Sequence, residues 1–166
     1  MKNILGIGNA LVDILYFLEN DLLLETFSLP KGSMQLVDAD KALQVEKAAG
    51  SLGKFMASGG SAANTIHGLA RLGAGAAFIG TVGNDTFGKF FENDMTSCGI
   101  SPLLSTGTLN TGRAIALVSQ SGERTFATYL GAAVELDASK LNASLFKKYD
   151  HLHLEVHVVP LPGADI

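Results

Sequence analysis

Two short segments carry residue types whose spacing could hold a polar ligand. The first is Gly59-Gly60-Ser61-Ala62-Ala63-Asn64. Adjacent glycines let a backbone approach a ligand or another segment closely, and a helix that starts after them presents unpaired N–H groups. Asn64 would project from the first turn of that helix, where its amide both donates and accepts hydrogen bonds. A tight turn with close helix packing through Ala62 and Ala63 is the structural alternative.

The second segment is Gly8-Asn9-Ala10-Leu11-Val12-Asp13, which follows the apolar run 4–7. If that run is a buried parallel strand, the segment lies at the carboxyl end, where open α/β sheets bind ligands. The carboxylate of Asp13 could accept paired hydrogen bonds from vicinal sugar hydroxyls. Alternatively, Asn9 is a turn residue and Asp13 is a solvated charge or a helix cap.

Histidine and cysteine do not indicate a metal centre. His151 and His153 would share a face of a strand, and His157 follows, but no further ligand of suitable spacing completes a coordination shell. We therefore predict no metal site. Cys98, at the end of a predicted helix, is expected to be a small hydrophobic residue rather than a reactive thiol.

The helices and strands that must position these residues alternate along the chain as they do in a parallel α/β sheet. Apolar periodicity and glycine stops predict a helix over 61–72, a strand over 76–82 and a helix over 86–97, with short joints. A further helix is predicted over 137–148 and a strand over 151–155.

A different pattern follows in the middle of the chain. Residues 112–119 and 124–130 alternate like strands and are joined as a hairpin. An antiparallel hairpin among parallel units predicts a small lid or second sheet beside the main one. Arg113 and Arg124 flank this hairpin and are expected to be solvated, although one of them could reach an anionic ligand.

Composition excludes several classes of protein. The chain has 166 residues, of which 47% are hydrophobic and 17% charged, with a net charge of −4, so it is not intrinsically disordered. The twelve basic residues are scattered, which argues against a nucleic-acid partner. No apolar run approaches membrane-spanning length and no signal peptide is evident, so no membrane association is expected. One cysteine fits a reducing, cytoplasmic location.

In order and spacing, four segments together resemble the PfkB carbohydrate kinase family, which includes ribokinases, fructokinases and adenosine kinases. These are residues 8–13, residues 59–64, Gly73 and residues 80–88. The long insertion after residue 13 and the Lys31-Gly32-Ser33-Met34 segment are most similar to the adenosine-kinase-like branch. The resemblance extends over most of the chain.

The resemblance implies a ribokinase-like (Rossmann-like) α/β fold, with a mostly parallel sheet flanked by helices and a small β lid built from strands near 13–37 and 112–130. It implies phosphorylation of a sugar or nucleoside hydroxymethyl group with ATP and Mg²⁺, and a possible homodimer through lid strands or an exposed sheet edge. Asp13 and Asn64 would hold the sugar hydroxyls, and Asn9 would support Asp13. The full set of implied substrate-binding residues is Asn9, Asp13, Gly59, Gly60, Asn64, Ile115, Leu117 and Phe126.

The family's catalytic half has no counterpart in this sequence. The Asp-Thr-x-Gly-Ala-Gly-Asp loop, whose last aspartate is the family's catalytic base, is absent, and Gly163-Ala164-Asp165 only superficially resembles it. We therefore expect no catalytic residue here, and a substrate-binding part over 1–155 that is inactive alone. Residues 156–166 read as an atypical tail from a frameshift or premature stop. The alternatives are a non-catalytic sugar- or nucleoside-binding module and a chain that only oligomerises.

Overall fold

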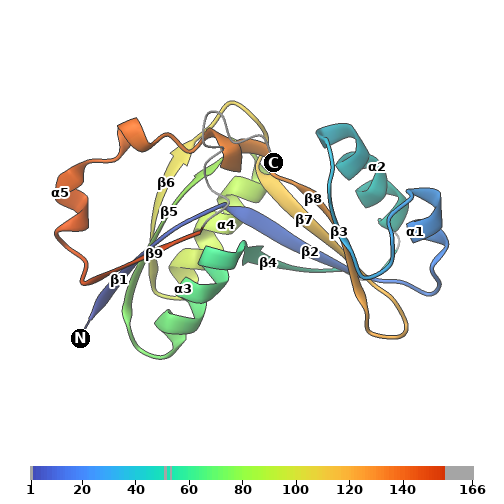
Figure 1. Cartoon of the computed structure of the whole chain (residues 1–166), viewed down its shortest axis with the longest axis horizontal. Coiled ribbons are helices and arrows are strands. Elements are labelled where there is room, and N and C mark those ends of the chain that lie inside the picture. The colour runs from blue at the N-terminus through green and yellow to red at the C-terminus, as the bar shows by residue number, and fades with distance from the viewer. Residues whose placement is uncertain (1, 51, 53, 156–166) are drawn as a thin grey trace.

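The structure is a computed structural model that describes residues 2–50, 52 and 54–155. The predicted tail 156–166 therefore lies outside the described residues. The strands form two sheets, placed toward opposite ends of the elongated molecule (Figure 1). The first sheet is entirely parallel and has the order β6-β5-β1-β9. Its strands are β1 (Asn3–Ile7), β5 (Gly75–Val82), β6 (Ile100–Thr106) and β9 (His151–Leu154).

The second sheet is mixed and has the order β3-β8-β7-β2-β4. Its strands are β2 (Leu11–Phe17), β3 (Met34–Leu36), β4 (Lys54–Gly59), β7 (Gly112–Val118) and β8 (Arg124–Tyr129). The predicted hairpin is confirmed, because β7 and β8 pair antiparallel and lie outside the parallel sheet. The strands expected in a lid are thus gathered in one sheet, and their closing over a ligand stays a prediction.

Two helices cover one face of the parallel sheet and also contact β4. They are α3 (Ser61–Arg71) and α4 (Thr86–Ser97), which confirms the predicted helix–strand–helix unit. The side chain of Asp85 caps α4 by accepting the Gly88 N–H at 2.8 Å. Helix α2 (Ala39–Ala49) lies on the second sheet instead, against β7 and β8. Within the described ranges, no helix has the length and apolarity needed to cross a membrane.

The opposite face of the parallel sheet is covered by irregular chain rather than by the single helix predicted over 137–148. That segment contains a 3₁₀ turn (Ala138–Lys140) and the short helix α5 (Ala143–Phe146), and another 3₁₀ turn (Gly131–Glu135) precedes it. The prediction fails because Asn142 accepts the Ser144 N–H at 2.9 Å and so starts a new helix inside the predicted one.

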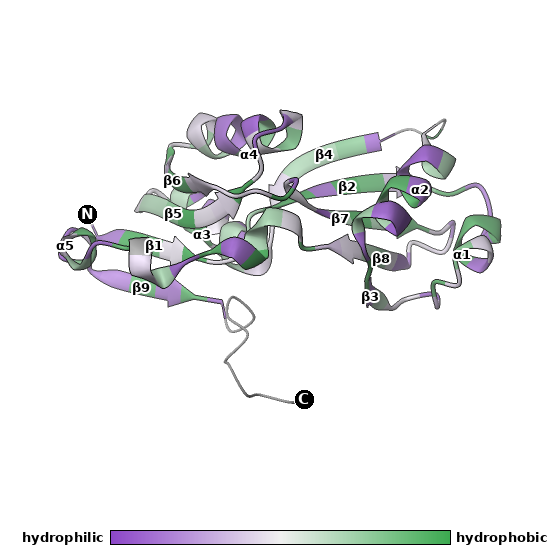
Figure 2. Cartoon of the chain, turned by 90° about the horizontal axis from the view of Figure 1, so that it is seen from above, coloured by the Kyte–Doolittle hydropathy of each residue, from purple (hydrophilic) through white to green (hydrophobic). Residues whose placement is uncertain are grey.

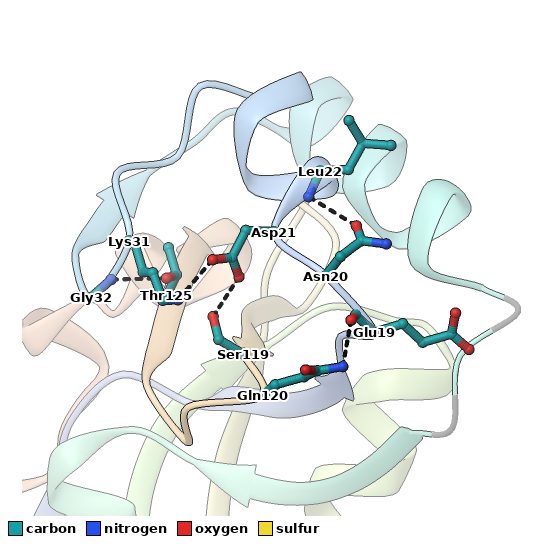
Figure 3. A network of polar contacts seen from close by, with 9 residues as sticks. All are labelled: Glu19, Asn20, Asp21, Leu22, Lys31, Gly32, Ser119, Gln120 and Thr125. Atoms are coloured by element: carbon teal, nitrogen blue, oxygen red, sulfur yellow. Dashed lines mark hydrogen bonds and ion pairs between the residues drawn. The ribbon is translucent and has the colours of Figure 1, made fainter.

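The long segment between β2 and β3 includes the short helix α1 (Leu22–Thr26) and is tied to the β7–β8 hairpin (Figure 3). Asp21 accepts the Ser119 hydroxyl at 2.9 Å and pairs with Lys31 at 2.7 Å. The hydrogen bonds from Lys31 and Ser119 lower the pKa of Asp21. These contacts hold the inserted segment, and with it β3, at the far edge of the second sheet.

Strand β2 separates the core from a more open face. It is coloured hydrophobic over most of its length in Figure 2. Val12, Ile14 and Tyr16 point into the main core, where at most 3% of each is exposed. Because successive strand residues face opposite sides of a sheet, Asp13 and Phe17 face away from that core. The open face of the second sheet is therefore the one that carries Asp13.

Candidate functional site

Asp13 lies on β2, next to the edge strand β4 of the second sheet, and is half-buried. It pairs in register with Ala57 of β4 and Ala114 of β7. Gly59 lies against its carboxylate, and a Cβ at that position would overlap the carboxylate atoms. Only glycine leaves this space, so the close approach expected for Gly59 is observed, with Asp13 as the neighbouring group.

Gly60 makes the turn from β4 into α3. Its φ of 99° is a conformation that residues with a side chain rarely adopt. A Cβ here would also collide with the backbone carbonyl of Asn9. The glycine pair therefore brings the segment 59–64 against the segment 8–13.

Asn64 completes the cluster from the first turn of α3. Its backbone N–H donates to the Gly60 carbonyl at 2.9 Å, and its side chain is hydrogen-bonded to Asp13. Burial raises the pKa of Asp13 to about 6, while the hydrogen bond with Asn64 acts in the opposite direction. Asn64 is exposed and Asp13 is half-buried, so the pair presents an amide and a carboxylate near the surface.

Asn9 lies in the turn between β1 and β2 and is 5% exposed. Its backbone N–H donates to Oε2 of Glu155 at 3.1 Å, and the Glu155 N–H donates to the Ile7 carbonyl at 3.0 Å. Glu155 thus holds this turn from the end of β9. Its part in the site went unnoticed in the sequence, since no local pattern links it to Asn9.

The expected lid residues divide between the two faces of the second sheet. Phe126 pairs with Ala116 and is half-buried on the same face as Asp13. Ile115 and Leu117 are fully buried in the main core on the opposite face. The expectation that they line the ligand is therefore corrected, because strand alternation directs both side chains away from Asp13.

On the face that carries Asp13, β7 instead presents Ala114 and Ala116, and both are buried. Ala114 pairs directly with Asp13, and Ala116 lies two positions further along the same face. A usable signal was present in the sequence, because β7 alternates small and bulky residues. Bulky residues favour the core side of a half-buried strand, which leaves the alanines to the open face.

Arg113 is also placed differently from the expectation of a solvated charge. It is 7% exposed and pairs with Glu46 of α2 at 2.9 Å. Its guanidinium lies 5.3 Å from the Phe87 ring centroid and 5.6 Å from that of Tyr129. Arg113 therefore joins β7 to α2 and α4 inside the protein, whereas Arg124 is exposed as expected.

The arrangement defines an α/β protein in which a carboxylate and an amide lie together beside a glycine turn. The sequence profile described as pfkB family carbohydrate kinase matches residues 34–165, and the chain belongs to this family. It is 34% identical over 107 residues to probable fructokinase-5 of Arabidopsis thaliana, covering 62% of this chain and 33% of that protein. With fructokinase-1 of Zea mays the identity is 32% over 101 residues, covering 58% and 31%.

Solved structures give the same relationship for the fold. An adenosine kinase from Sinorhizobium meliloti superposes with a TM-score of 0.80 at 35% identity, covering 92% of this chain and 46% of that one. A probable sugar kinase from Rhizobium etli superposes with the same TM-score, identity and coverage. The predicted ribokinase-like fold is thus confirmed. The chain spans about a third of the curated relatives above and just under half of these solved chains.

Proposed function

We propose that this chain carries the substrate-binding part of a kinase that phosphorylates a hydroxymethyl group of a sugar or nucleoside. The observation that supports this most directly is the Asp13–Asn64 pair, set on the Gly59-Gly60 turn of a pfkB-family chain. Because the chain is similar both to fructokinases and to an adenosine kinase, we propose either a sugar or a nucleoside as the substrate.

In the proposed complex, two vicinal hydroxyls donate hydrogen bonds to the Asp13 carboxylate, and the Asn64 amide contacts the same edge of the sugar. Charge-assisted hydrogen bonds of this kind are stronger than neutral ones. The glycine turn seats Asn64 beside Asp13. Phe126, half-buried on the same face of the sheet, offers an apolar contact.

The phosphoryl donor implied by the family is ATP, together with Mg²⁺. Within the part of the chain that the structure describes, no group of three His, Cys, Asp or Glu residues could hold a metal ion. The sequence also lacks the family's glycine-rich catalytic loop. We therefore derive no step through ATP or Mg²⁺, and propose that this chain binds substrate without turning it over.

Titration calorimetry with adenosine, ribose and fructose tests the proposal. We expect one of these compounds to bind, and Asp13→Ala to abolish its heat of binding. Phe17→Ser, on the same strand and the same face but four residues away, serves as the control and should retain binding. Failure of all three compounds to bind would contradict the proposal.

A coupled assay for ADP release, with ATP and Mg²⁺ present, tests the proposed lack of turnover. No release above background is expected from the purified chain. Sustained release that disappears in Asp13→Ala would show that the chain is a complete catalyst and would refute the binding-only part of the proposal.

A further inference from the structure

A hydrogen-bonded cluster behind the candidate site joins three elements that surround the glycine turn. Ser58 lies in β4, His67 in α3 and Asp94 in α4. The Ser58 hydroxyl donates to Oδ2 of Asp94 at 2.5 Å, and the Ser58 backbone N–H donates to the same oxygen at 2.8 Å. Nε2 of His67 lies 2.6 Å from Oγ of Ser58. Ser58, the central residue of this cluster, directly precedes Gly59 in the chain.

The residue types are those of a hydrolytic triad, but the order of contacts is different. In such a triad the imidazole lies between the hydroxyl and the carboxylate, whereas here the hydroxyl lies between the other two groups. A carboxylate only accepts, so the Ser58 proton is committed to Asp94 and Nε2 of His67 must donate. Ser58 is also 3% exposed. The cluster therefore holds a strand rather than activating a nucleophile.

The place of Ser58 explains why it needs such partners. Strand β4 is an edge strand of the second sheet, and edge strands leave backbone groups without a partner strand. The backbone N–H of Ser58 is satisfied by Asp94 instead. Because alternate residues face opposite sides, Ser58 faces the helices while Gly59 faces Asp13. Movement of Ser58 would therefore move Gly59 against the carboxylate.

We propose that His67 and Asp94 are positioning residues of the candidate site. By holding Ser58 from two helices, they fix the Gly59-Gly60 turn against Asp13 and Asn9. The consequence for ligand affinity rests on the proposed function, but the fixing of the turn can be measured without any ligand.

Amide hydrogen exchange, followed by NMR on the full chain, measures the fixing of the turn directly. In His67→Leu and in Asp94→Leu, exchange at Gly59 and Asn64 should be at least about tenfold faster, because local opening governs exchange. Amides of α2, which packs elsewhere on the sheet, should be unchanged. His67→Gln retains a donor and Asp94→Asn an acceptor, so both should remain within about threefold of the wild type.

Two further variants separate positioning from a general loss of stability. Met95→Ala removes a fully buried side chain next to Asp94 in the sequence, and should destabilise the fold without selectively affecting Gly59. Ser58→Ala, a milder change, should accelerate exchange at Gly59 even if the leucine variants fail to fold. Unchanged exchange in Ser58→Ala and the leucine variants, or equal acceleration by Met95→Ala, would overturn the inference.

Adenosine, ribose and fructose titrations complete the test. Affinity for the compound that binds the wild type should fall about tenfold in the leucine variants, and return in His67→Gln and Asp94→Asn as the turn is fixed again. Accelerated exchange without a change in affinity would overturn the positioning role. A wild type that binds none of the three compounds would contradict the proposed function, while the exchange result still decides whether the cluster fixes the turn.

Discussion

Asp13 is the residue at which folding and binding make opposite demands. Its charged form is the one that would accept sugar hydroxyls, yet burial disfavours that form and raises the pKa to about 6. The ordinary pKa of an aspartate, 3.8, applies to the unfolded chain. Because the pKa is higher in the folded state, ionisation of Asp13 lowers the free energy of unfolding of the protein. The molecule therefore tolerates a destabilising charge at this position.

Asp13→Asn should raise the free energy of unfolding at pH 7 by about 1–2 kcal/mol, because the amide carries no charge to desolvate. The gain should develop between pH 4 and about pH 6, the interval between the two pKa values, and vanish below it. Urea denaturation across this range measures it. The same substitution should weaken ligand binding. A stability difference that does not vary with pH would contradict this account of the charge.

Gly59 and Gly68 provide a matched pair of glycine-to-alanine substitutions. At Gly59 a Cβ would overlap the Asp13 carboxylate, whereas at Gly68, inside α3, it would meet open space. Gly59→Ala should therefore displace Asp13 and weaken ligand binding by at least about tenfold. Gly68→Ala should stabilise the fold by about 0.5–1 kcal/mol and leave affinity unchanged. Calorimetry and thermal unfolding measure both, and similar effects of the two substitutions would refute the assignment.

Most of the site could be recognised in the sequence because its residues sit in short segments with strong local signals. Asn9, Asp13 and Asn64 each follow or precede glycines, whose spacing indicates a turn at a sheet rim. Ile115 and Leu117 were misassigned because the resemblance placed the strand without fixing which of its faces meets the ligand. Glu155 is too distant in sequence from Asn9 to be found by any local pattern.

Among the helices and strands, the helices whose ends are marked by glycine were predicted correctly, and strands without a clear signal were missed. Helices α3 and α4 were predicted correctly because glycines with positive φ follow them at positions 73 and 99. The sequence analysis predicts no strand at β4, because the end of this strand carries the small residues of the glycine turn. Strand β6 contains Pro102, an unusual strand residue that is tolerated here because β6 is an edge strand.

The ion pair between Arg113 and Glu46 links β7 to α2, and its removal should be costly. Burial raises the pKa of Glu46, and Arg113 acts against that rise. In Arg113→Met the glutamate would be left buried without its partner, so the free energy of unfolding should fall by about 3–5 kcal/mol at pH 7. Chemical denaturation measures the loss.

The double variant Arg113→Met/Glu46→Gln is the control for that prediction. With the charge removed from both positions, most of the lost stability should return, because a neutral side chain is cheaper to bury than an unpaired carboxylate. The single variant should also recover at acidic pH, where Glu46 becomes protonated. A double variant that is no more stable than Arg113→Met would show that packing around Phe87 and Tyr129, rather than charge, dominates.

At the scale of the whole molecule, the open face of the second sheet leaves much apolar surface in water. Between 57% and 64% of Phe17, Met34, Leu36 and Phe55 is exposed. Strand register places all four on the face that carries Asp13. Exposed apolar side chains gathered on one face of a sheet mark an interaction site or promote association.

We expect the isolated chain to self-associate through this face, whereas the family resemblance implied a possible homodimer through lid strands or an exposed sheet edge. Sedimentation velocity over a range of protein concentrations should show a reversible increase in mass. Phe17→Ser combined with Phe55→Ser should weaken the association at least about tenfold, since each aromatic side chain buries a large apolar area. Leu72→Ser, at an 85% exposed residue beyond the end of α3, is the matched control. If Leu72→Ser weakens association as strongly as the double variant does, the sheet face is not the cause. Association would then depend on exposed apolar side chains in general.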